Sequence, residues 1–70
     1  MTQKITIQVN GLQQMLPAGS NVLALLDMLD LTGKRVAVER NGGVVPRSEQ
    51  ESTVLLEGDQ IEVIRAVGGG

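Results

Sequence analysis

The segment from residue 22 to residue 29 constrains the fold most, because it is the one part of the chain that reads as a helix of several turns. Its apolar residues recur at spacings of three and four: Val22, Leu25, Leu26 and Leu29. This spacing predicts a helix of about 10 residues with one apolar face. Ser20 or Asn21 is the predicted N-cap, and Gly33 the predicted stop. A lone helix with one apolar face needs a sheet to cover it.

Strand-like alternation fills most of the remaining chain. Ile5, Ile7 and Val9 alternate with polar residues, which is typical of a half-buried strand over residues 4–9. Asn10-Gly11 predicts a tight hairpin turn into a return strand over residues 12–16. One further strand is expected to begin at Val36, and a short extension to follow the turn at residues 41–43. A brief strand is expected at residues 53–56 and the last strand over residues 60–67. Before these two strands, residues 47–51 should contain one short helical turn.

This order of elements predicts an α+β protein with a β-grasp (ubiquitin-like) fold, in which a mixed sheet of four to five strands wraps one main helix. The strand 60–67 should be central and parallel to the strand 4–9. We expect residues 1–67 to form the β-grasp domain and residues 68–70 a flexible C-terminal glycine tail. The predicted core consists of Ile5, Ile7, Val9, Val22, Leu25, Leu26, Leu29, Val36, Val38, Ile61 and Val63.

The composition excludes several classes of function. The chain has no Cys and no His, which removes a thiol nucleophile, an imidazole base, a disulfide framework and a Cys/His zinc site. With a net charge of −2 it lacks the basic surface that nucleic acid requires, and no apolar run is long enough to span a membrane. We therefore expect no enzyme, no metal site, and no binding to nucleic acid or membrane. The absence of Cys is compatible with the cytosol, and we expect a cytoplasmic protein that is monomeric when free.

Three polar features favour ordinary structural roles. Arg40, Arg47 and Arg65 are scattered along the chain without a glycine-rich phosphate loop, so they are interpreted as surface charges. Residues 41–43 are interpreted as a turn rather than a nucleotide loop, since no capped helix follows. Asp27 and Asp30 lie beside the apolar stripe of the helix and should be solvated rather than bind a metal.

Gly68-Gly69-Gly70 close the sequence. Glycine has no side chain and tolerates almost any backbone conformation, so three in a row can form a thin thread that enters a narrow cleft of a partner. A carboxylate presented at its tip is a group on which another enzyme can act. The alternative is a frayed tail without function.

Together, these features resemble the ubiquitin-like sulfur carrier family, and within it most closely the sulfur carriers of thiamine biosynthesis. The likeness rests on the hairpin at Asn10-Gly11, the Leu-rich helix, "ERNGGVVPR" at residues 39–47 and "EGDQIEVIRAVGGG" at residues 57–70. These segments span nearly the whole chain, and the last two are much more specific than a Gly-Gly ending alone.

The resemblance implies a carrier rather than a catalyst. In this family an adenylating enzyme of the ubiquitin-activating type, using ATP and magnesium, activates the terminal carboxylate, which here is that of Gly70. Sulfur supplied by a donor enzyme replaces the adenylate, and the thiocarboxylate serves thiazole synthase. Gly68 and Gly69 would thread into the partners' active sites, and the chain itself would bind no cofactor. Ile64 and Ala66, on the sheet face that no helix covers, are candidate docking residues, since related proteins dock through this face.

Three alternatives remain open. A small subunit of molybdopterin synthase shares the fold and the chemistry, but that family tends to be longer and to carry aromatic residues near its final strand, whereas this chain has no aromatic residue. A ubiquitin-like protein modifier begins with the same activation. A plain binding module would not need the glycine tail, so deletion of Gly69 and Gly70 should leave it unharmed.

Overall fold

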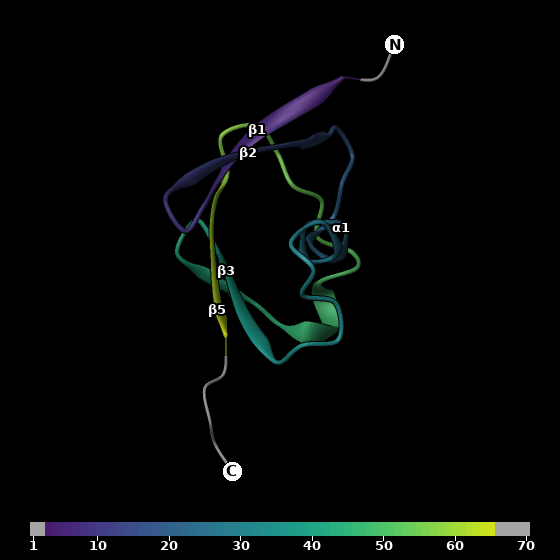
Figure 1. Ribbon diagram of the computed structural model, residues 1–70, viewed down its shortest axis with the longest axis vertical. Helices are drawn as coiled ribbons and strands as arrows, with labels where there is room; N and C mark the ends of the chain where they lie inside the picture. The colour runs from purple at the N-terminus through teal and green to yellow at the C-terminus, as the bar shows by residue number, and fades with distance from the viewer. Residues whose placement is uncertain (1–2, 66–70) are drawn as a thin grey trace.

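The computed structural model describes residues 3–65 and shows a five-stranded mixed sheet that packs against one helix (Figure 1). The strand order is β2-β1-β5-β3-β4. Strand β5 is central, parallel to β1 and antiparallel to β3. The predicted α+β, β-grasp fold and the central position of the last strand are confirmed. The elements are β1 (Lys4–Val9), β2 (Leu12–Pro17), α1 (Val22–Met28), β3 (Val36–Arg40), β4 (Gly43–Val45), the 3₁₀ turn η1 (Arg47–Glu49) and β5 (Gln60–Arg65).

Two Asn-Gly turns set the registers of the hairpins. Asn10 and Gly11 have φ values of 50° and 81°, and Asn41 and Gly42 have values of 51° and 86°. Positive φ at both central residues is the requirement of the tight hairpin turn that Asn-Gly favours. Val9 therefore pairs with Leu12, and Arg40 with Gly43.

The side chain of Asn10 also joins the first hairpin to β5. Its Oδ1 accepts from the Val63 amide at 2.8 Å, and its Nδ2 donates to the Val63 carbonyl at 3.1 Å. The amide of Asn10 donates to the carbonyl of Ile61 at 2.9 Å. This turn residue thus continues the parallel β1–β5 ladder beyond its last paired residues, Val9 and Ile61.

The helix begins where the sequence predicts and ends earlier. Of the two candidate caps, Asn21 is the one used, since its Oδ1 accepts from the Ala24 amide at 2.8 Å. The helix has 7 residues instead of about 10. Asp30 adopts a φ of 61°, and the amide of Leu31 turns back to the carbonyl of Leu26 at 2.8 Å. This is a Schellman ending, so the prediction that Gly33 stops the helix was wrong.

Eight of the predicted core residues are buried between sheet and helix, and three others are only partly buried. Ile5, Leu29 and Val36 lie at the ends of their elements and pack against the rim of the core. Leu16, Val45 and Leu55 are buried although they were not predicted. Leu55 lies in an irregular segment, because the strand expected at 53–56 is reduced to a single bridge between Val54 and Asn21. The confirmed members are Ile7, Val9, Val22, Leu25, Leu26, Val38, Ile61 and Val63.

Two further local predictions are confirmed. The short helical turn is η1, and Asp27 and Asp30 are both exposed. Within residues 3–65, no helix has the length and apolar character needed to cross a bilayer.

Candidate functional site

Strand β5 leads directly into the segment in which the sequence places the carrier chemistry. Gly68, Gly69 and Gly70, together with the proposed docking residue Ala66, lie outside residues 3–65. The predicted roles of these residues and the domain boundary at residue 67 therefore stay predictions. What the structure describes is the platform that precedes them, with β5 held by β1 on one side and β3 on the other.

The outer face of the sheet, opposite the helix, carries an apolar patch. Ile61 and Val63 face the core, and Ile64 points the other way with half of its surface exposed. Ile64 pairs with Ala37 on β3, and the outward-facing Val44 on β4 is 70% exposed. We call Ala37, Val44 and Ile64 the outer patch. Alternation along β5 predicted the exposure of Ile64. The corresponding alternation on β3 and β4 offered a signal for Ala37 and Val44, which were not predicted.

Two carboxylates border the outer patch. Glu39 of β3 pairs directly with Glu62 of β5, so both point to the outer face. Like charges on directly opposed residues of neighbouring strands destabilise a sheet. With these two glutamates beside Ala37, Val44 and Ile64, the outer face combines exposed apolar surface with concentrated negative charge.

A buried carboxylate holds the start of β5 in place. Asp59 is 6% exposed, and its Oδ2 accepts from Arg40 Nε at 2.9 Å and from the Leu56 amide at 2.8 Å. Its Oδ1 accepts from Asn41 Nδ2 at 3.0 Å. Arg40 is thus one half of an ion pair rather than the simple surface charge that the sequence predicted. No local pattern in the sequence indicates this pairing.

These contacts set the ionisation of Asp59. Burial acts to raise the pKa of the carboxyl, but hydrogen bonds from Leu56, Asn41 and Arg40, with the positive charge of Arg40, outweigh it and hold the pKa below its ordinary value of 3.8. Asp59 therefore stays ionised near neutral pH and acts as a structural acceptor. Among residues 3–65, no group of three or more potential metal-ligating side chains comes together.

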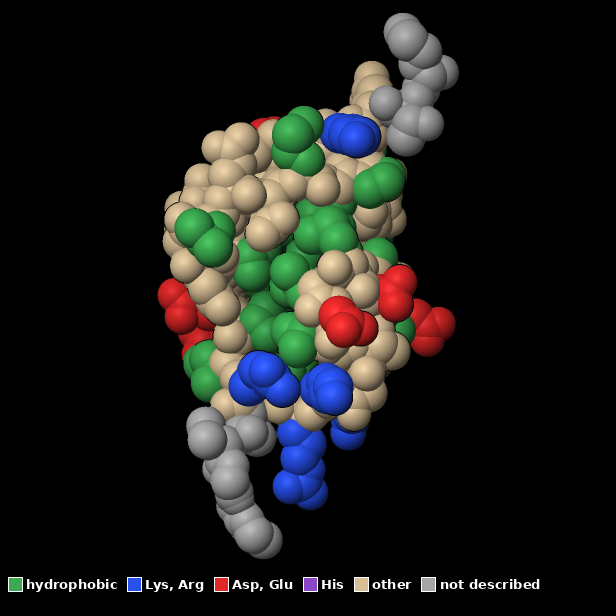
Figure 2. All heavy atoms as spheres, in the orientation of Figure 1, with side chains coloured by type: hydrophobic (Ala, Val, Ile, Leu, Met, Phe, Trp, Pro, Cys, Tyr) green, Lys and Arg blue, Asp and Glu red, His purple; other side chains and the backbone are tan. Residues whose placement is uncertain are grey.

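A cavity opens on the helix side of the sheet, between the turn after α1 and η1. It has a volume of about 120 Å³, and Arg47 and Gln50 border it. On the face shown in Figure 2, hydrophobic side chains are visible between sheet and helix, with basic side chains below them. Sequence reasoning did not single out Gln50, which lies in a polar connection.

Comparison with known proteins places this geometry in context. Residues 3–70 match the model of the ThiS family. A crystal structure of the thiamine biosynthesis protein ThiS from Geobacter metallireducens superposes with a TM-score of 0.80 at 32% identity, covering 94% of this chain and all of that one.

Two proteins named thiazole synthase are also similar. The one from Magnetococcus marinus is 44% identical over 64 residues, covering 91% of this chain and 20% of that protein. The one from Paramagnetospirillum magneticum is 37% identical over 62 residues, covering 89% of this chain and 19% of that protein. The chain thus spans about a fifth of the length of either synthase. The family match over nearly the whole sequence and the shared β-grasp architecture lead to one assignment: the chain belongs to the ThiS family.

Proposed function

We propose that this chain is a sulfur carrier of thiamine biosynthesis, with the carboxylate of Gly70 as the site to which sulfur is attached. The observation that carries the proposal is the ThiS family match over residues 3–70. The similarity of the fold to a ThiS structure at 32% identity supports it. In this role the chain is a carrier and not an enzyme, in keeping with a sequence that has no Cys and no His.

The proposed reaction takes place in two steps on partner enzymes. An adenylating enzyme, with ATP and magnesium, joins the Gly70 carboxylate to the α-phosphorus of ATP and releases pyrophosphate. Hydrosulfide released by a donor enzyme then attacks the acyl carbon, the bond to AMP breaks, and the product is the Gly70 thiocarboxylate. The first step is needed because a free carboxylate is ionised at neutral pH and is a poor electrophile. Gly68 and Gly69 offer no side chains that would obstruct entry into either site.

We propose thiazole synthase as the acceptor of the sulfur. Two proteins with that name contain a segment similar to this chain, which suggests that the two activities are used together.

The test is to incubate the full chain with its adenylating enzyme, ATP, magnesium and a sulfur source, and to measure the intact mass. The mass should rise by the difference between one sulfur and one oxygen, and fragmentation should place the change on Gly70. A matched chain without Gly69 and Gly70 should not change. Transfer of the sulfur to a molybdopterin precursor, or attachment of the chain to lysines of other proteins, would favour the alternative carrier or modifier roles.

We further propose that the outer patch and Ala66 dock the partner enzymes. Ile64 lies on the strand that leads to the tail, and the neighbouring pair Glu39 and Glu62 would complement a basic rim on an apolar partner surface. Ile64→Asp should weaken binding to both enzymes and leave the fold intact, because Ile64 contributes little to the core. Met15→Asp is a matched control, since Met15 is 55% exposed on β2 at the far edge of the sheet. Unchanged binding of a folded Ile64→Asp chain to both partners would refute this docking surface.

A further inference from the structure

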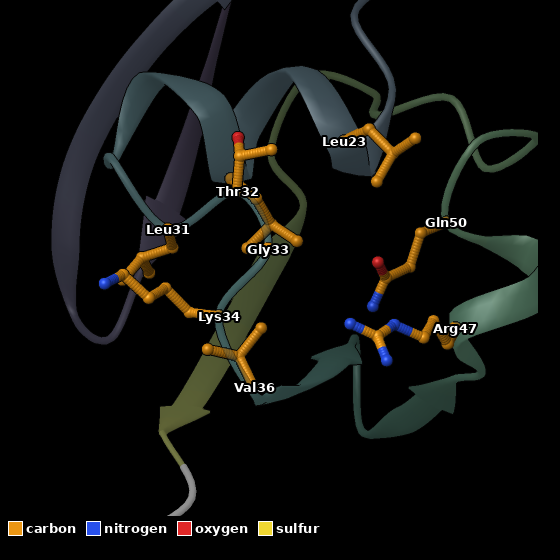
Figure 3. A pocket seen from close by; sticks show the side chains of 9 residues that line it. Leu23, Leu31, Thr32, Gly33, Lys34, Val36, Arg47 and Gln50 are labelled. Carbon is orange, nitrogen blue, oxygen red and sulfur yellow. The ribbon is translucent and has the colours of Figure 1, made fainter.

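The cavity between α1 and η1 combines an apolar wall with two polar groups. Leu23 and Leu26 of the helix and Val36 of β3 form apolar parts of the wall, and Arg47 and Gln50 border the opposite side. Figure 3 shows the Arg47 and Gln50 side chains reaching into the space from the η1 side. The proposed carrier chemistry makes no use of this site.

The amide of Gln50 is the most informative group in the cavity. The residue is only 6% exposed, and among residues 3–65 its side chain takes part in none of the hydrogen bonds. Within the same residues, no side-chain nitrogen or oxygen that is fully removed from solvent lacks a partner. The Gln50 amide must therefore keep its solvent contact through the cavity. A nearly buried amide in this situation is available to a ligand.

Arg47 gives the cavity its charge. Figure 3 shows its guanidinium and the Gln50 side chain pointing into the cavity from the same side, while Lys34 extends away from both. The ion pair between Arg40 and Asp59 is the only one among residues 3–65, so Arg47 has no carboxylate partner there. On the helix, Asp27 accepts from Thr32 Oγ1 at 3.3 Å, and no acidic residue is part of the described cavity wall. Neither the Arg47 nor the Gln50 side chain has an ion-pair or hydrogen-bond partner among residues 3–65, and both can donate N–H groups. They therefore suit a carboxylate, which the planar guanidinium can bind through two parallel hydrogen bonds.

We propose that this cavity binds the side chain of a glutamate of a partner protein, with its methylene groups against the apolar wall and its carboxylate on Arg47 and Gln50. A volume of about 120 Å³ is well below the roughly 300–1,000 Å³ of sites for small organic ligands, and it suits a single side chain. Val36, in the cavity wall, pairs with Arg65, the last described residue of β5. A protein that receives the segment after Arg65 is therefore within reach of the cavity.

The test is an NMR titration of the isotope-labelled full chain with a capped tripeptide that has a central glutamate. The Gln50 side-chain amide and the methyl groups of Leu26 and Val36 should shift and saturate. The same peptide with glutamine in the centre should bind about tenfold more weakly, because it lacks the charge that Arg47 recognises. Arg47→Gln and Gln50→Leu should each weaken binding of the glutamate peptide by about fivefold to tenfold. Arg35→Gln, an exposed cation outside the cavity wall, is the matched control and should bind normally.

Three outcomes would overturn the proposal. The first is equal binding of the two peptides, and the second is the absence of saturable shifts at Gln50. The third is saturable binding of propionate, which has the three carbons of the glutamate side chain, without binding of the peptide, because it would assign the cavity to free small carboxylates. Arg47 is exposed, so Arg47→Gln keeps the test valid even if Gln50→Leu fails to fold. The titration uses the chain alone, so its result is independent of the sulfur-carrier proposal.

Discussion

Replacing Asp59 by alanine should bring the domain close to unfolding under conditions in which the parent chain is stable. The substitution removes one buried carboxylate and leaves three donors without their acceptor, on Arg40, Asn41 and Leu56. These donors belong to two loops that are far apart in sequence and meet at the start of β5. The loss should therefore loosen the central strand as well as the turn.

The magnitude follows from the number and kind of hydrogen bonds. A hydrogen bond to a charged group contributes about 1.5–3 kcal/mol, but the three share one carboxylate and are not additive. The Arg40 side chain is also 27% exposed, so water partly replaces its lost contact. We expect a loss of about 3–5 kcal/mol for Asp59→Ala. A domain of this size is stable by about 4–10 kcal/mol in total, so this is a large fraction.

The assay must suit a chain without aromatic residues, whose unfolding cannot be followed by intrinsic fluorescence. Urea titrations followed by far-ultraviolet circular dichroism report the free energy of unfolding. Asp27→Ala, which removes an exposed carboxylate from the helix, is the matched control and should change the free energy by less than about 0.5 kcal/mol. A loss below about 1 kcal/mol for Asp59→Ala would refute the structural role assigned to this carboxylate.

Three further predictions concern the same domain and are tested with the same urea titrations. Leu26→Ala should cost about 2–5 kcal/mol, because Leu26 is 4% exposed, whereas Leu23→Ala on the exposed side of the helix should cost far less; equal losses would contradict the core assignment. Asp30→Gly should stabilise the chain by about 0.5–1 kcal/mol. It relieves the backbone strain of a non-glycine residue at a φ of 61° and removes negative charge from the carboxyl end of the helix. Any destabilisation would count against the Schellman ending. Because the pKa of Asp59 is lowered, the contribution of its carboxylate to the free energy of unfolding is fully present above the ordinary value of 3.8 and is lost as the pH falls through the lower folded value. Asp59→Asn should therefore lose less stability than the parent chain between pH 5 and about pH 2. Parallel losses in the two chains would refute the lowered pKa.

Most strands and both Asn-Gly turns could be predicted from the sequence because their signals are local, whereas the strand expected at 53–56 is only a single bridge. Period-two alternation identified the inward faces of β1 and β5, and Asn-Gly identified both hairpin turns. The same alternation placed Ile64 on the outer face. Leu55 could not be predicted as a core residue, because it is buried through an irregular segment that pairs with Ser20 rather than through a periodic strand.

Contacts between residues that are distant in the chain could not be predicted. Asn10 and Val63 are 53 positions apart, and Arg40 and Asp59 are 19 apart, so no short window of sequence contains either pair. Gln50 belongs to a polar connection in the sequence, and only the fold shows that it borders a cavity. Asp30 ends the helix in a conformation that glycine adopts more readily, which made Gly33 the more obvious stop in the sequence.

The central position of β5 has a consequence for folding. The sheet cannot form while only the amino-terminal part of the chain has been synthesised, because β1 and β3 both pair with β5, which is synthesised after them. A ribosome-bound chain that has not yet released β5 exposes two unpaired strand edges, which are sites of association between chains. The pairing of β1 with β5 also requires closure of a long loop, which slows folding compared with local contacts. Formation of the complete domain is thus delayed until the strand that precedes the glycine tail has emerged.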